Sequence, residues 1–166
     1  MRCCHTLYTG TTWRPPYESD MLLLEATAGC THHKCKFFTL YEDLPFSFRM
    51  SPMEDIKEDL AEVYRILKRF QGYAYKRSFL IGANSFMLKF QRLMDIAEQI
   101  HRYIPTIETI GCFARITDVT LKTNQELRSL RQAGFNGLSI EVKTGHRNAC
   151  HYSNSVRHSW LRRIRW

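Results

Sequence analysis

Two cysteines, Cys30 and Cys35, lie five positions apart on one predicted loop. Thiolates at this spacing can bind one soft metal ion or one face of an iron–sulfur cluster. His32 and His33 lie between them, so a zinc site is the rival interpretation. Zinc would need two more ligands at suitable spacing, and the nearest other cysteines are adjacent rather than spread. The loop therefore predicts metal or cluster chemistry.

Apolar strands that alternate with amphipathic helices must position this loop. The predicted strands span residues 22–26, 78–83, 106–113 and 138–142, and the intervening helices begin near residues 51, 86 and 123. This alternation indicates an α/β fold with parallel strands joined by right-handed crossovers. A doubly wound sheet and the first part of a barrel both fit. Either architecture places a ligand site at the carboxyl ends of the strands.

Helix signals support these boundaries. Ser51, Pro52 and Glu54 predict an N-cap, a first-turn proline and a capping box, and Thr123 with Glu126 predicts a second box. The apolar stripe of the first helix comprises Met53, Ile56, Leu60, Val63, Leu67 and Phe70. Its acidic residues, interpreted as a solvated face, are Glu54, Asp55, Glu58, Asp59 and Glu62.

Composition and charge bound the class of protein. The chain has 166 residues, of which 44% are apolar, enough for one domain with an ordinary core. The apolar runs are too short to cross a bilayer, and no apolar leader is present, so a cytoplasmic protein is expected. Of the net charge of +8, the five arginines of residues 146–166 contribute +5 without any acid. This tail is interpreted as a disordered or foreign segment, with a nucleic-acid footprint as the alternative.

The stretch from Tyr8 to Arg49 resembles the opening of a radical S-adenosylmethionine (radical SAM) enzyme. Its pattern is R-P-P, then a strand, then Gly29-Cys30-Thr31 and Cys35, similar to G-C-S/T-x-x-x-C-x-F/W-C in uncharacterised bacterial members. The resemblance continues through Gly-Ala-Asn at 82–84 to residue 145. It implies the N-terminal part of a partial TIM-like barrel at 21–145, truncated, after an N-terminal extension at 1–20.

The resemblance also implies a chemistry. Three cysteines hold a 4Fe–4S cluster, which receives an electron from flavodoxin or ferredoxin and cleaves S-adenosylmethionine to a 5′-deoxyadenosyl radical. The substrate, a small molecule or RNA, is not identified. Cys30 and Cys35 would be cluster ligands. Cofactor-binding positions would be Phe37 near the adenine, Gly82, Ala83 and Asn84 at the methionine amino group, and Arg115 at the carboxylate or ribose.

The chain departs from this pattern at three places. Phe38 stands at the third ligand position, and replacement by Cys3, Cys4 or Cys112 is conceivable, although Cys112 is more simply a buried strand residue. Lys143 stands where relatives usually have Glu. After residue 145 the arginine-rich tail replaces the expected helix, which suggests a frameshift product. The alternative function is therefore a non-catalytic remnant or a basic nucleic-acid-binding module that binds metal weakly.

Overall fold

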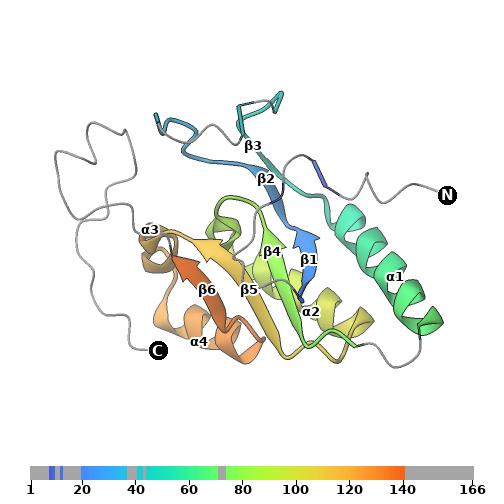
Figure 1. Ribbon diagram of the computed structural model, residues 1–166. Helices are drawn as coiled ribbons and strands as arrows, with labels where there is room; N and C mark the ends of the chain where they lie inside the picture. The colour runs from blue at the N-terminus through green and yellow to red at the C-terminus, as the bar shows by residue number, and fades with distance from the viewer. Residues whose placement is uncertain are drawn as a thin grey trace.

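A parallel sheet of four strands organises the protein. The computed structural model describes residues 8–9, 12, 20–36, 41–42, 44–70 and 74–140. The strands are β1 (Leu22–Glu25), β4 (Arg77–Ile81), β5 (Thr109–Ala114) and β6 (Gly137–Ile140), and they lie side by side in chain order (Figure 1). Every neighbouring pair is parallel. The predicted α/β class with parallel strands is confirmed.

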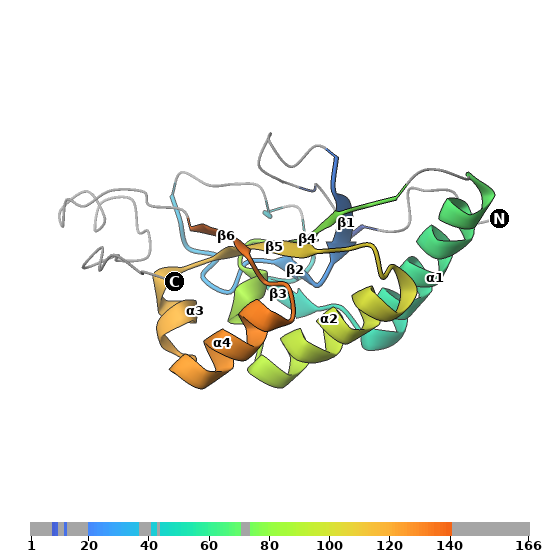
Figure 2. The same cartoon turned by 90° about the horizontal axis from the view of Figure 1, so that it is seen from below.

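The connecting helices cover one face of this sheet. They are α1 (Met53–Arg69), α2 (Phe90–Tyr103), the short α3 (Ile116–Thr120) and α4 (Asn124–Gln132), with a 3-10 turn η3 (Ser85–Met87) before α2. Figure 2 shows α2, α3 and α4 on the same side of the strands. The largest buried cluster lies between helices and sheet; among its members are Leu24, Ile56, Leu60, Leu80, Leu93, Ile96, Ile110, Cys112 and Leu130. Alternate strand residues therefore point toward the helices.

The opposite face of the sheet is also apolar. Met21, Phe79 and Ile81 are buried there, with Leu23 and Phe113 packed against them. The rings of Phe79 and Phe113 meet edge to face with centroids 5.2 Å apart. Such two-sided burial is typical of parallel sheets, whose strands read as continuous apolar runs.

A second, two-stranded sheet was not predicted. β2 (Thr27–Gly29) pairs antiparallel with β3 (Phe48–Met50), where the sequence indicated a long loop after the first strand. The expected strand at 22–26 ends at Glu25, and the chain then turns into β2. Three-residue strands carry too little alternation to be recognised, because tertiary pairing rather than local pattern forms them.

The helix signals were correct at α4 and wrong at α1. Thr123 caps α4: its hydroxyl accepts from the backbone N–H of Glu126, and the Glu126 carboxylate accepts from the backbone N–H of Thr123. Ser51, however, is not the N-cap of α1; Pro52 holds that position without any side-chain cap. Ser51 is buried, and its backbone N–H donates to the carbonyl of Ala26 at 3.1 Å instead of starting the helix. The predicted core residue Phe70 follows the last turn of α1 and is 63% exposed.

Several predictions concern positions outside the described ranges. These are the third ligand position Phe38, the adenine-contacting Phe37, the substituted Lys143, and the tail at 146–166; of the extension at 1–20 only residues 8–9, 12 and 20 are described. Among the described helices, none combines the length and apolar character needed to cross a membrane.

The acidic face of α1 is not uniformly solvated, contrary to the prediction. Asp59 is half-buried, and burial, followed by the negative charges of Glu25, Asp55 and Glu58, raises its pKa to about 6 from 3.8. The folded state therefore holds the Asp59 proton more tightly than the unfolded chain does. Stability contributed by that proton is present below pH 4 and is lost as the pH rises through about 6.

Replacing Asp59 should therefore help at neutral pH. The variant Asp59→Asn removes the cost of the buried charge, so it should melt at a higher temperature than the wild type at pH 7.5 and lose this advantage at pH 4. Thermal melts followed by circular dichroism at both pH values measure this. Glu58→Gln, an exposed neighbour on the same helix, is the control and should shift the Tm less; an equal shift for both would contradict the assignment.

Candidate functional site at the carboxyl edge of the sheet

The cysteine loop begins after Gly29, the last residue of β2, where the backbone conformation requires a glycine. Gly29 has φ +76°, and a Cβ there would lie 2.3 Å from the carbonyl oxygen of Ser47. The next residue, Cys30, donates its N–H to that same oxygen at 2.8 Å. The two ends of the loop are thus held together beside the carboxyl edge of the sheet. Cys30 and Cys35 are both partly exposed on this loop.

A second glycine brings the end of β4 against β2. Gly82 has φ +121°, and a Cβ there would lie 2.0 Å from Oγ1 and 2.5 Å from the carbonyl oxygen of Thr27. Below this contact the hydroxyls of Thr27 and Ser85 are 3.1 Å apart, and Ser85 donates to the carbonyl of Ile81 at 2.8 Å. Only glycine combines this conformation with this approach. The turn at 82–84 is therefore fixed beside the base of the cysteine loop.

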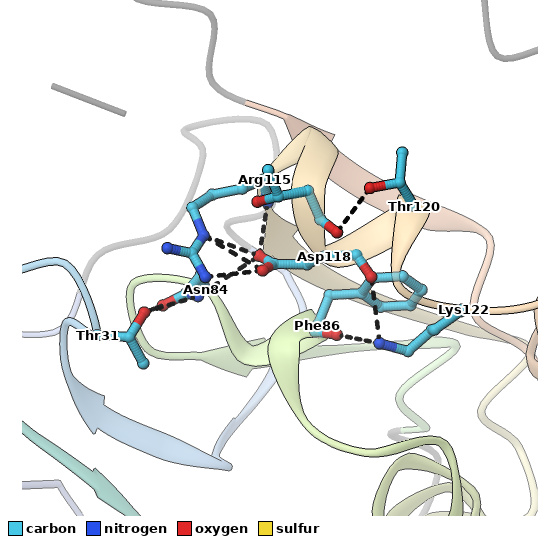
Figure 3. A network of polar contacts seen from close by, with 8 residues as sticks. Thr31, Asn84, Phe86, Arg115, Asp118, Thr120 and Lys122 are labelled. Atoms are coloured by element: carbon cyan, nitrogen blue, oxygen red, sulfur yellow. Dashed lines mark hydrogen bonds and ion pairs between the residues drawn. The ribbon is translucent and has the colours of Figure 1, made fainter. Parts of the chain in front are cut away.

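Asn84 connects three strand ends. It is 3% exposed, and its amide lies 3.3–3.4 Å from the hydroxyl of Thr31 in the cysteine loop and 3.4 Å from Oδ2 of Asp118 beyond β5 (Figure 3). Turning the amide by 180° lets its oxygen accept from Nη2 of Arg115 at 3.0 Å. In both orientations Asn84 joins the loop after β2 to the turn after β5.

The carboxylate of Asp118 accepts hydrogen bonds from both the backbone and the side chain of Arg115. It accepts from the N–H of Arg115 at 2.9 Å, from Nη2 at 2.7 Å and from Nε at 3.1 Å. The side chain of Asp118 is 1% exposed, whereas that of Arg115 is 28% exposed. The hydrogen bond to Asp118, opposed by desolvation and aided by the charges of Asp118 and Cys30, raises the pKa of Arg115. The guanidinium is therefore a permanent, oriented cation within electrostatic range of Cys30.

A half-buried lysine closes the other side of this network. Nζ of Lys122 donates to the carbonyl of Phe86 at 2.7 Å and lies 4.4 Å from the centre of the Phe86 ring (Figure 3). Desolvation lowers its pKa, while the charge of Asp118 acts in the opposite direction. Lys122 therefore anchors the turn after α3 to η3 and helps to balance the buried carboxylate.

Most of the predicted site residues are brought to this edge. Gly82, Ala83, Asn84 and Arg115 lie on adjacent turns, and Thr31 ties the start of the cysteine loop to them. The structure adds Asp118 and Lys122, which sequence reasoning missed. The arginine followed three positions later by aspartate was the available signal, since a carboxylate at this spacing can return to the backbone N–H at a helix start.

Among the described residues, the thiol donors near this edge are fewer than a 4Fe–4S cluster requires. Cys112 is fully buried among the residues facing the helices, and burial raises the pKa of its thiol far above the usual range. It is a core residue and does not join Cys30 and Cys35. Within the described part of the chain no three His, Cys, Asp or Glu residues are grouped so as to bind a metal ion. The described donor set therefore does not fit a three-thiolate cluster site.

Comparison with known proteins adds no relative. A scan against models of protein families finds no match to this chain, and neither curated proteins nor solved structures match it. What the site can bind is therefore inferred from its residues and their geometry.

The buried carboxylate should be necessary for stability. We expect Asp118→Asn to lower the free energy of unfolding by about 2 kcal/mol. The NH2 group of the new amide would face N–H donors of Arg115, and the negative charge that compensates the guanidinium would be lost. Urea denaturation followed by circular dichroism measures this.

The matched control is Glu62→Gln, which breaks an ion pair of the same three-residue spacing between exposed side chains, Arg65 and Glu62. It should cost less than about 0.5 kcal/mol. Equal losses in the two variants would show that burial of Asp118 contributes nothing.

Proposed function

We propose that this chain is a radical SAM-type domain whose carboxyl edge binds S-adenosylmethionine and whose cysteine loop is an incomplete cluster site. The strand order supports an arc of a partial βα barrel, since consecutive strands are neighbours and the helices lie on one face. A doubly wound sheet would reverse its strand order and place helices on both faces.

The observation that carries the proposal is the meeting of three strand ends at Asn84. The sequence resemblance assigns the cysteine loop to the cluster and the 82–84 turn to the methionine amino group. It assigns Arg115 to the methionine carboxylate or the ribose. Asn84 lies within hydrogen-bonding distance of Thr31 and, with its amide turned by 180°, of Arg115, and the three residues belong to sequence-distant turns. Strand pairing alone would not require polar side chains to converge there.

The residues present suit the amino-acid part of the ligand better than they suit a cluster. The Asn84 amide carries both donor and acceptor atoms, and Arg115 offers an exposed fraction of its guanidinium to a carboxylate. Asp118 keeps the guanidinium in place and offsets its charge, so the edge is suited to a zwitterion rather than to a polyanion. When S-adenosylmethionine is bound beside a complete cluster, it supplies a 5′-deoxyadenosyl radical. With two thiolates in the loop, no radical step is assigned to this chain.

Restoring the third thiol should complete the cluster site. After anaerobic reconstitution, the wild-type chain should contain clearly fewer than four iron and four acid-labile sulfide ions, and Phe38→Cys should approach about four of each. The assay is colorimetric iron and sulfide per chain, with an ultraviolet–visible spectrum.

The control is Phe70→Cys, which adds a thiol at the exposed end of α1, away from the loop. Its iron content should equal that of the wild type. If Phe38→Cys takes up no more iron than Phe70→Cys, the loop is not a cluster site and the proposed family function fails.

We expect Asn84 to contribute to the affinity of the site for S-adenosylmethionine. In reconstituted Phe38→Cys protein, adding Asn84→Ala should weaken binding of radiolabelled S-adenosylmethionine at least tenfold in equilibrium dialysis, because the buried amide contacts both flanking turns. Iron content should be unchanged, which separates ligand binding from cluster loading. Unchanged affinity would remove Asn84 from the binding site.

A further inference from the structure

Among the described helices, none packs on the face of the sheet that holds Met21, Phe79 and Ile81, which we call the helix-free face. Met21, Phe79 and Ile81 are at most 6% exposed, although α1, α2 and α4 pack on the other face. One described residue that covers this face comes from the N-terminal part of the chain. Tyr8 packs against the apolar cluster, and its hydroxyl donates to the carbonyl of Leu23 at 3.4 Å.

The next residue is held by a buried carboxylate. Glu25, the last residue of β1, is 8% exposed and lies on the same face as Leu23. Its Oε2 accepts from the backbone N–H of Thr9 at 2.6 Å, and its Oε1 accepts from the Thr9 hydroxyl at 2.7 Å. A buried carboxylate is stable only when its acceptor capacity is used. Thr9 therefore satisfies Glu25, and Glu25 fixes Thr9 at the carboxyl edge.

A third residue connects this contact to the cysteine loop. Nη2 of Arg49 donates to the Thr9 hydroxyl at 2.6 Å and lies 3.7 Å from Oε1 of Glu25. Arg49 belongs to β3, and β3 pairs with β2. The loop between these two strands carries Cys30 and Cys35. We call the set Thr9, Glu25 and Arg49 the Glu25 latch.

We propose that Tyr8 and Thr9 form a strap that closes the helix-free face at its carboxyl edge, and that the Glu25 latch couples release of this strap to opening of the cysteine loop. When Thr9 leaves, Glu25 loses two hydrogen bonds and Arg49 loses one acceptor. The strand β3 is then held to the main sheet less firmly, and β3 anchors one end of the loop. A ligand that spreads from the carboxyl edge over the helix-free face must displace this strap.

The latch is independent of metal or S-adenosylmethionine, so it can be tested on the metal-free, full-length chain. The readout is the rate of alkylation of Cys30 and Cys35 by iodoacetamide, resolved by peptide mass spectrometry. Thr9→Val removes the hydroxyl that joins Glu25 to Arg49, and we expect both rates to rise at least fivefold. Glu25→Gln weakens the three contacts that Glu25 makes with Thr9 and Arg49, and it should raise both alkylation rates further.

Two controls make the result specific. Thr12→Val makes the same chemical change at an exposed threonine three residues away and should leave the rates at the wild-type value. The buried Cys112 reports global unfolding and should stay unreactive in every variant. Unchanged rates at Cys30 and Cys35 in both latch variants, or a parallel rise at Cys112, would overturn the coupling. Because no iron is present, failure of cluster reconstitution has no bearing on this outcome.

Discussion

The carboxyl edge of this protein depends on one buried carboxylate. Asp118 is almost inaccessible to solvent, and its oxygens accept from the backbone and side chain of Arg115. The amide of Asn84 donates to Asp118 in one orientation and accepts from Arg115 in the other. A charge in this position would be strongly unfavourable without these partners. Because Asn84 contacts this ion pair, burial of Asp118 also requires the turn after β5 to lie against the turn after β4. The polar edge and the geometry of the strand ends are therefore one structural feature.

Two close backbone approaches allow that edge to form. Gly29 lets the two ends of the cysteine loop meet at Ser47, and Gly82 lets the turn after β4 rest against Thr27. Both residues have positive φ in positions where a side chain would collide with backbone oxygen, so their role is steric as well as conformational. The small antiparallel pair β2 and β3 is the consequence. It keeps the base of the cysteine loop in contact with the main sheet.

The two faces of the sheet are completed differently. Helices bury one face through the conventional packing of amphipathic stripes, whereas on the other face Tyr8 is among the residues that cover the apolar cluster. Glu25 lies at the boundary between that face and the carboxyl edge, where Thr9 and Arg49 surround it. In this arrangement the N-terminal contact and the cysteine loop share a neighbour. A change in the N-terminal contact should therefore alter the cysteine loop through a short path of hydrogen bonds.

The sequence by itself determined the alternation of strands and helices, the parallel class and the capping of α4, because these follow from local periodicity and from contacts three residues apart. It also placed Gly82, Asn84 and Arg115 at strand ends. The resemblance to radical SAM proteins and the cluster-ligand roles of Cys30 and Cys35 remain predictions. Tertiary structure alone decided that Ser51 is buried beside Ala26, that Phe70 is exposed, and that Asp118 and Glu25 are the buried acceptors. Those outcomes depend on groups distant in the chain, since the cost of burying a polar group is set by partners that local pattern does not specify.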